Sequence, residues 1–126
     1  MTTANRTERT VSAIAHIGTA ALAFPTLGLS TLLLPGALYL IYRGRSRFVA
    51  FHALQTLLFI AAMLLLAGIG YLVNAVTPFS VLGWIILLPV FLLSIGLPVM
   101  GGIKALKGEK WIYPFVGYSA GKITKV

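Results

Sequence analysis

Cysteine and aspartate are absent from the sequence, and Glu8 and Glu109 are its only acidic residues. Without cysteine, disulfides and thiolate metal sites are excluded. Because no carboxylate lies inside the long apolar stretches, paired-carboxylate catalysis, carboxylate metal sites and acid-based proton relays lack their residues. The serines have no acid-supported triad, and no phosphate-binding GxxxxGK[ST] motif occurs. We therefore expect a protein that is not an enzyme.

Apolar residues are abundant instead. The chain has 126 residues, of which 59% are hydrophobic and 10% are charged, against about 45–50% and about 25% in average soluble proteins. A soluble domain of this size buries only about two-thirds of the surface that its unfolded chain exposes, so much apolar surface would face water. This composition predicts an integral membrane protein.

The ten lysines and arginines fall into three clusters, within residues 6–9, 43–47 and 104–125. Basic clusters between uncharged stretches are typical of the cytoplasmic flanks of membrane spans. We interpret the basic loop of Arg43, Arg45 and Arg47 as such a topology signal. Its functional alternative is contact with anionic lipid head groups, at about 1 kcal/mol per basic residue, or with a protein segment. No nucleic-acid partner is expected, because no basic face of a soluble module is present.

The first uncharged stretch, residues 11–42, would be about 48 Å long as one helix, against a hydrocarbon core about 30 Å thick, so a single span would have to tilt steeply. Pro25, Thr26 and Gly28 predict a turn in its middle, and a hairpin there brings all three basic clusters to one side. We predict an all-α integral membrane protein with four transmembrane helices in two hairpins and both termini cytoplasmic. The expected spans are about residues 9–24, 27–42, 48–76 and 81–104.

Residues 1–118 are expected to form one membrane domain, followed by a cytoplasmic tail at 119–126. Within that domain, segment 105–118 should lie along the membrane surface, because Trp111, Tyr113 and Tyr118 alternate with lysines as interfacial aromatics do. The first 24 residues also resemble a signal peptide with an A-x-A cleavage site at 21–23. That alternative leaves the later spans unchanged.

Few polar side chains lie within the expected spans. His52, Gln55 and Thr56 share one helix face at spacings i, i+3 and i+4, and His16 of the first span lies at a similar depth. We take this as the candidate polar helix face of the bundle. No metal and no cofactor are expected. The alternative is a haem or chlorin held between the two imidazoles of His16 and His52.

Three stretches, "SAIAHIGTAALAFPTLG", "LYLIYRGRSRFVAFHALQTLLF" and "GIKALKGEKWIYPFVG", resemble the Tic-twenty-like family of small membrane proteins, which includes bacterial relatives. The resemblance implies a four-helix membrane fold and, for the plastid members, a part in protein import across the inner envelope. The positions that match the family motifs are Phe48, Phe51, His52, Gln55, Tyr113, Pro114 and Phe115.

We therefore expect a multi-pass protein of the inner (plasma) membrane of a prokaryote, acting in a protein-translocating or other multi-subunit membrane complex. Two alternatives remain open: a structural accessory subunit of a larger membrane assembly, and a small haem- or pigment-binding protein that uses His16 and His52. Anionic lipid head groups and protein subunits are the expected partners, and a homo-oligomer is compatible with the sequence.

Overall fold

The computed structural model describes residues 3–23, 29–77 and 81–125. Within these ranges every regular element is helical, which confirms the predicted all-α class. In chain order the elements are α1 (Arg6–Ala13), the π-helical turn η1 (Ile14–Gly18), α2 (Thr19–Ala23), the 3-10 turn η2 (Leu29–Leu32), α3 (Leu33–Tyr42), α4 (Arg47–Val76), α5 (Val81–Leu106) and α6 (Gly117–Thr124).

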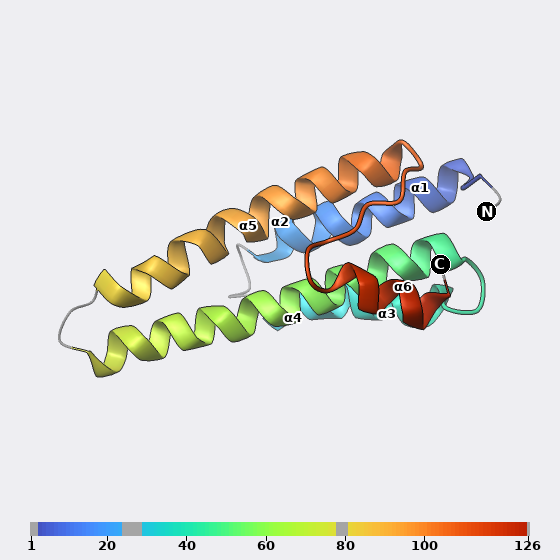
Figure 1. The fold of residues 1–126 in the computed structure, drawn as a ribbon. Helices are drawn as coiled ribbons and strands as arrows, with labels where there is room; N and C mark the ends of the chain where they lie inside the picture. The colour runs from blue at the N-terminus through green and yellow to red at the C-terminus, as the bar shows by residue number, and fades with distance from the viewer. Residues whose placement is uncertain (1–2, 24–28, 78–80, 126) are drawn as a thin grey trace.

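Helices α4 and α5 form a long antiparallel pair that runs the whole length of the molecule (Figure 1). They contain 30 and 26 residues, which corresponds to about 45 and 39 Å at 1.5 Å per residue. Both are long and apolar enough to cross a membrane. Only 22% and 17% of their most apolar stretches are buried, whereas the central helix of a soluble protein is mostly buried. The sequence prediction of long apolar helices near 48–76 and 81–104 is confirmed.

Glycines set the spacing of this pair at the end far from the basic residues. The Gly83 amide donates a hydrogen bond of 2.9 Å to the side-chain oxygen of Asn74. A Cβ atom placed on Gly83 would lie 2.4 Å from the Gly70 carbonyl oxygen, closer than atoms can approach. Small residues of this kind let two helix backbones touch within a membrane.

The described parts of the first hairpin lie beside only one half of the α4–α5 pair (Figure 1). Asn5 and Glu8 start α1 with a reciprocal capping box. The run from residue 6 to residue 23 is about 27 Å long, much shorter than α4. The expected spans at 9–24 and 27–42 therefore correspond to shorter, interrupted helices, and the turn predicted at Pro25–Gly28 lies outside the described residues.

The structure describes most of the segment for which we expected a surface stretch at 105–118 and a cytoplasmic tail at 119–126. Helix α5 continues to Leu106, and residues 107–116, which we call the strap, then run without regular structure over the bundle. Helix α6 follows and packs on α4, with Ala120 buried against Phe51 and Leu54. The small side chains on α6 permit this close approach. The first and last described residues lie at the same end as the loop between α3 and α4 (Figure 1).

Candidate functional site

Five buried polar side chains from three segments meet in the half of the bundle near the basic residues. We call this group the polar node: His16, His52, Gln55, Thr56 and Tyr113. Each of the five side chains is fully shielded from solvent. His16 comes from η1, Tyr113 from the strap, and the other three from the first turns of α4. The structure thus brings together the four residues of the predicted polar face and adds a tyrosine.

His16 is the centre of the node. Its Nε2 lies 2.8 Å from His52 Nδ1, and its Nδ1 lies 2.8 Å from both the Tyr113 hydroxyl and Thr56 Oγ1. The side chain projects from a π-helical turn, a distortion that is rare and concentrated at functional positions. One imidazole therefore links the first hairpin to α4 and to the strap.

The Gln55 side chain forms hydrogen bonds with the backbone of the strap. Its amide nitrogen donates to the Trp111 carbonyl at 2.8 Å, and its amide oxygen accepts from the Tyr113 N–H at 3.3 Å. A backbone without regular structure leaves such groups unpaired, and at membrane depth they are tolerated only where protein groups satisfy them. The Gln55 amide therefore replaces the hydrogen bonds that a helix would supply to the strap.

These partners also assign the protons in the node. Because a carbonyl can only accept and a backbone N–H can only donate, the orientation of the Gln55 amide is fixed. Its Nε2 therefore donates to His52 Nδ1, at 3.2 Å. In a neutral imidazole one nitrogen accepts and the other carries the proton, so His16 donates to His52 from Nε2 and accepts at Nδ1. The Tyr113 hydroxyl can then donate to His16.

This assignment places the His52 proton on Nε2. That atom is buried and has no hydrogen-bond partner among the described residues. The Glu109 backbone carbonyl is a neighbouring acceptor, but it lies outside hydrogen-bonding geometry. The Phe48 ring packs edge-on against the imidazole, with 4.5 Å between centroids. Phe48 thus covers one side of the His52 imidazole, and the His52 Nε2–H is the one donor of the polar node that lacks an acceptor among the described residues.

Apolar contacts hold the strap at depth. The Tyr113 ring stacks on Phe59 with centroids 4.5 Å apart and planes 5° from parallel. Phe59 follows Arg47, the first residue of α4, by 12 residues, or about 18 Å along the helix. A Cβ atom on Gly101 would lie 3.0 Å from His16 Nδ1, so α5 also closes tightly on the node. The strap therefore dips into the bundle instead of lying on its surface.

The two imidazoles are not arranged as ligands of one shared metal. Metal–nitrogen bonds of about 2.0–2.1 Å at tetrahedral angles would hold two ligand nitrogens about 3.3 Å apart, with both lone pairs directed at the metal. Here His16 Nε2 donates to His52 Nδ1 at 2.8 Å, so the facing nitrogens bind each other. The part of the chain that the structure describes also contains no group of three or more His, Asp or Glu residues able to hold a metal.

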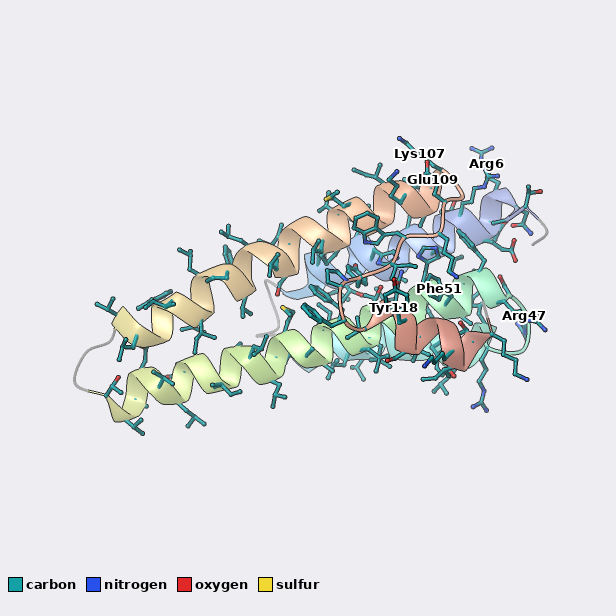
Figure 2. All side chains as sticks on the ribbon, in the orientation of Figure 1. Arg6, Arg47, Phe51, Lys107, Glu109 and Tyr118 are labelled. Atoms are coloured by element: carbon teal, nitrogen blue, oxygen red, sulfur yellow. The ribbon has the colours of Figure 1, made fainter. Side chains whose placement is uncertain are left out.

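The basic residues gather at one end of the bundle. Figure 2 shows Arg6, Arg47 and Lys107 at the end of the bundle where α4 begins and α5 ends. The basic loop of Arg43, Arg45 and Arg47 is exposed there. This end carries the positive charge of the whole chain, whose formal net charge is +8.

Both acidic residues lie at the same end and have hydrogen-bond partners there. Glu8 accepts hydrogen bonds from the Ser46 hydroxyl at 2.5 Å and from the Asn5 amide at 2.8 Å. Glu109 pairs with Lys104 at 2.5 Å, and the hydrogen bond from this lysine lowers the pKa of the carboxyl group. Glu109 thus pairs within its own segment, whereas Glu8 lies beside the basic loop, because Ser46 stands between Arg45 and Arg47. Among the described residues neither acid forms an ion pair with Arg43, Arg45 or Arg47.

The remaining predicted positions divide between core and surface. Phe48 and Phe51 are buried around His52. Tyr113, which we expected at the membrane interface, lies inside the bundle, and Trp111 is half-buried. In contrast, Phe115 is 95% exposed, next to the exposed Pro114.

Tyr118 on α6 is 75% exposed, and its place at the membrane interface stays a prediction. Sequence reasoning missed the Phe59–Tyr113 stack and the contact of Asn74 with Gly83. The only signal for the latter was an isolated asparagine and a glycine at opposite sides of the predicted turn.

Comparison with known protein families matches residues 7–119 to the family described as magnetosome magnetite crystal formation protein family (MamF/MmsF). Searches of curated proteins and of solved structures found no match. The family match covers nearly the whole chain and overturns the resemblance to the Tic-twenty-like family, which was wrong. The expected role in protein transport rested on that resemblance and falls with it.

Proposed function

The chain belongs to the magnetosome magnetite crystal formation protein family, and we propose that it takes part in this process as a non-enzymatic, multi-pass protein of the membrane that encloses the crystal. The family match supports the process. The distribution of apolar and charged side chains supports the membrane location.

The observation that carries the membrane location is the separation of charge from apolar surface along the α4–α5 pair. Large apolar side chains are exposed along both helices, for example Leu65, Val76 and Ile85. All ten lysines and arginines lie before Phe48 or after Gly102. Exposed apolar surface of this extent is stable in lipid but not in water.

We propose four membrane-inserted segments with both termini on the cytoplasmic side. The described ends of the chain and the basic loop share one end of the bundle (Figure 1), and basic residues are retained on the cytoplasmic side of membranes. The anionic head groups of that leaflet would be the partners of Arg43, Arg45 and Arg47. Membership of a multi-subunit complex stays a prediction.

We propose that the polar node holds the segments of this bundle in position. It joins the first hairpin, α4 and the strap through hydrogen bonds in a region that excludes water. Each of these hydrogen bonds satisfies polar groups that would otherwise be unpaired. These hydrogen bonds fix the positions of the first hairpin and the strap, which are short segments.

Deletion of the gene in its source organism tests the proposal. Electron microscopy of the cells should show magnetite crystals that are altered in number, size or shape, and re-expression of the native chain should restore them. Gln55→Met should restore them less well, because it disconnects the strap. Gly68→Ala is the matched control on the same helix, since a Cβ atom there meets nothing within 4 Å. Crystals that are unchanged by the deletion would refute the proposed function.

A further inference from the structure

The two halves of the α4–α5 pair have very different surroundings. In the half near the basic residues, every α4 residue from Phe48 to Thr56 is buried. In the other half, the only buried residues described between 61 and 97 are Gly70 and Gly83, and these two face each other across the pair. The near half is therefore enclosed by other segments, and the far half is not.

The near half owes its enclosure to three additional segments: the first hairpin's two arms and α6. A Cβ atom on Gly102 of α5 would lie 2.4 Å from Ile17 of η1, and one on Gly36 of α3 would lie 3.9 Å from Leu57 of α4. Ala120 of α6 packs against the same helix. Figure 1 shows these segments beside one half of the long pair only.

The difference in cross-section follows from helix dimensions. A helix of about 10–12 Å diameter occupies roughly 80–110 Å² in the membrane plane, so three additional helical segments add about 240–330 Å² to one leaflet. The exposed apolar side chains of the far half lie all around the pair, not on one face: Leu65, Tyr71 and Leu72 on α4, Leu82 and Trp84 on α5. Such a surface suits lipid chains, which surround a helix pair, better than a single protein partner.

Resting on the membrane location proposed above, we infer that the molecule is a wedge that favours a bilayer curved convexly toward its basic end. A wider near half occupies more area in the leaflet that faces the arginine loop than in the opposite leaflet. That leaflet expands relative to the other when it is the outer, convex one. A vesicle or invagination that projects into the cytoplasm has this curvature, with its cytoplasmic leaflet on the convex side.

Orientation sorting in vesicles tests the wedge. The chain has no cysteine, so Arg45→Cys and Val81→Cys each introduce a single label site, one at each end of the long pair. Each purified variant is reconstituted into large and small vesicles of one lipid composition. A membrane-impermeant thiol reagent, added before and after detergent, then gives the fraction of sites that face outward.

The wedge predicts that the outward-to-inward ratio of residue 45 rises by about twofold or more from large to small vesicles, because convex outer leaflets select one orientation. Residue 81 should show the inverse ratio. Adding Gln55→Met should reduce the change, because α6 directly follows the strap in the chain and moves away from α4 when the strap is released. Adding Gly68→Ala should leave it intact.

Failure of the wedge and failure of the membrane topology are distinguishable. If residues 45 and 81 are labelled from opposite sides but their outward-to-inward ratios are the same at every vesicle size, the wedge alone is overturned. Labelling of both residues from the same side overturns the topology. Efficient disulfide formation by Leu72→Cys between chains in the bilayer would also overturn the wedge, since a second copy would then fill the space assigned to lipid.

Discussion

Replacing Gln55 with methionine should release the strap from α4 while the helices stay folded. The change keeps the side-chain volume but leaves the Trp111 carbonyl and the Tyr113 N–H without their partner. A buried backbone group without a hydrogen bond costs about 1–3 kcal/mol. Two such groups, partly relieved by movement of the strap, give about 2–4 kcal/mol, or about 30- to 1,000-fold in the equilibrium for strap opening.

Amide hydrogen exchange of the detergent-solubilised protein measures this opening directly. Protection of the strap, residues 107–116, should fall by that factor in Gln55→Met, while protection in the middle of α4 is retained. Leu57→Met is the matched control, because Leu57 is partly buried on the same helix and a leucine-to-methionine change costs less than about 1.5 kcal/mol. Equal protection of the strap in the two variants would show that Gln55 does not anchor it.

Three further predictions concern the two ends of the bundle. Gly83→Ala places a Cβ atom 2.2 Å from the Asn74 side-chain oxygen, so it should lower the free energy of unfolding in detergent by about 1–3 kcal/mol. Gly68→Ala should leave this free energy unchanged, and equal stability of the two variants would contradict the close contact of α4 and α5 at Gly83. Tyr113→Phe removes the hydroxyl next to His16 and should lower the same free energy by about 0.5–1.5 kcal/mol; an unchanged value would mean that this hydrogen bond does not stabilise the fold. Burial raises the pKa of the Tyr113 phenol above its ordinary value of 10.0, so the folded state holds this proton more tightly and loses stability as the pH rises above about 10. The phenolate signal of Tyr113, identified in an ultraviolet titration by its absence in Tyr113→Phe, should therefore appear only when the protein unfolds. Its appearance in the folded protein near pH 10 would contradict the burial.

The sequence predicted the long helices and the segregation of charge, because both follow from local composition. It also identified four of the five residues of the polar node, since His52, Gln55 and Thr56 are separated by three and four residues on one helix and His16 lies at a matching depth. Their contact is observed, and their role in function stays a prediction.

The strap could not be predicted from its own residues. Lysines alternating with aromatics are typical of a membrane interface, and Tyr113 is buried only because Gln55 pairs with the backbone and Phe59 offers a flat ring. Such complementarity joins residues more than fifty positions apart. The π-helical turn that carries His16 has no recognisable local signal either, because it depends on what the side chain must reach.

The position of the charged end relative to the membrane is the central claim, and cysteine labelling in sealed vesicles from the source organism tests it most directly. Single cysteines at Arg45 and Lys122 should react with an impermeant reagent from the same side, and a cysteine at Val81 only from the opposite side. Reaction of residues 45 and 81 from one side would contradict the account.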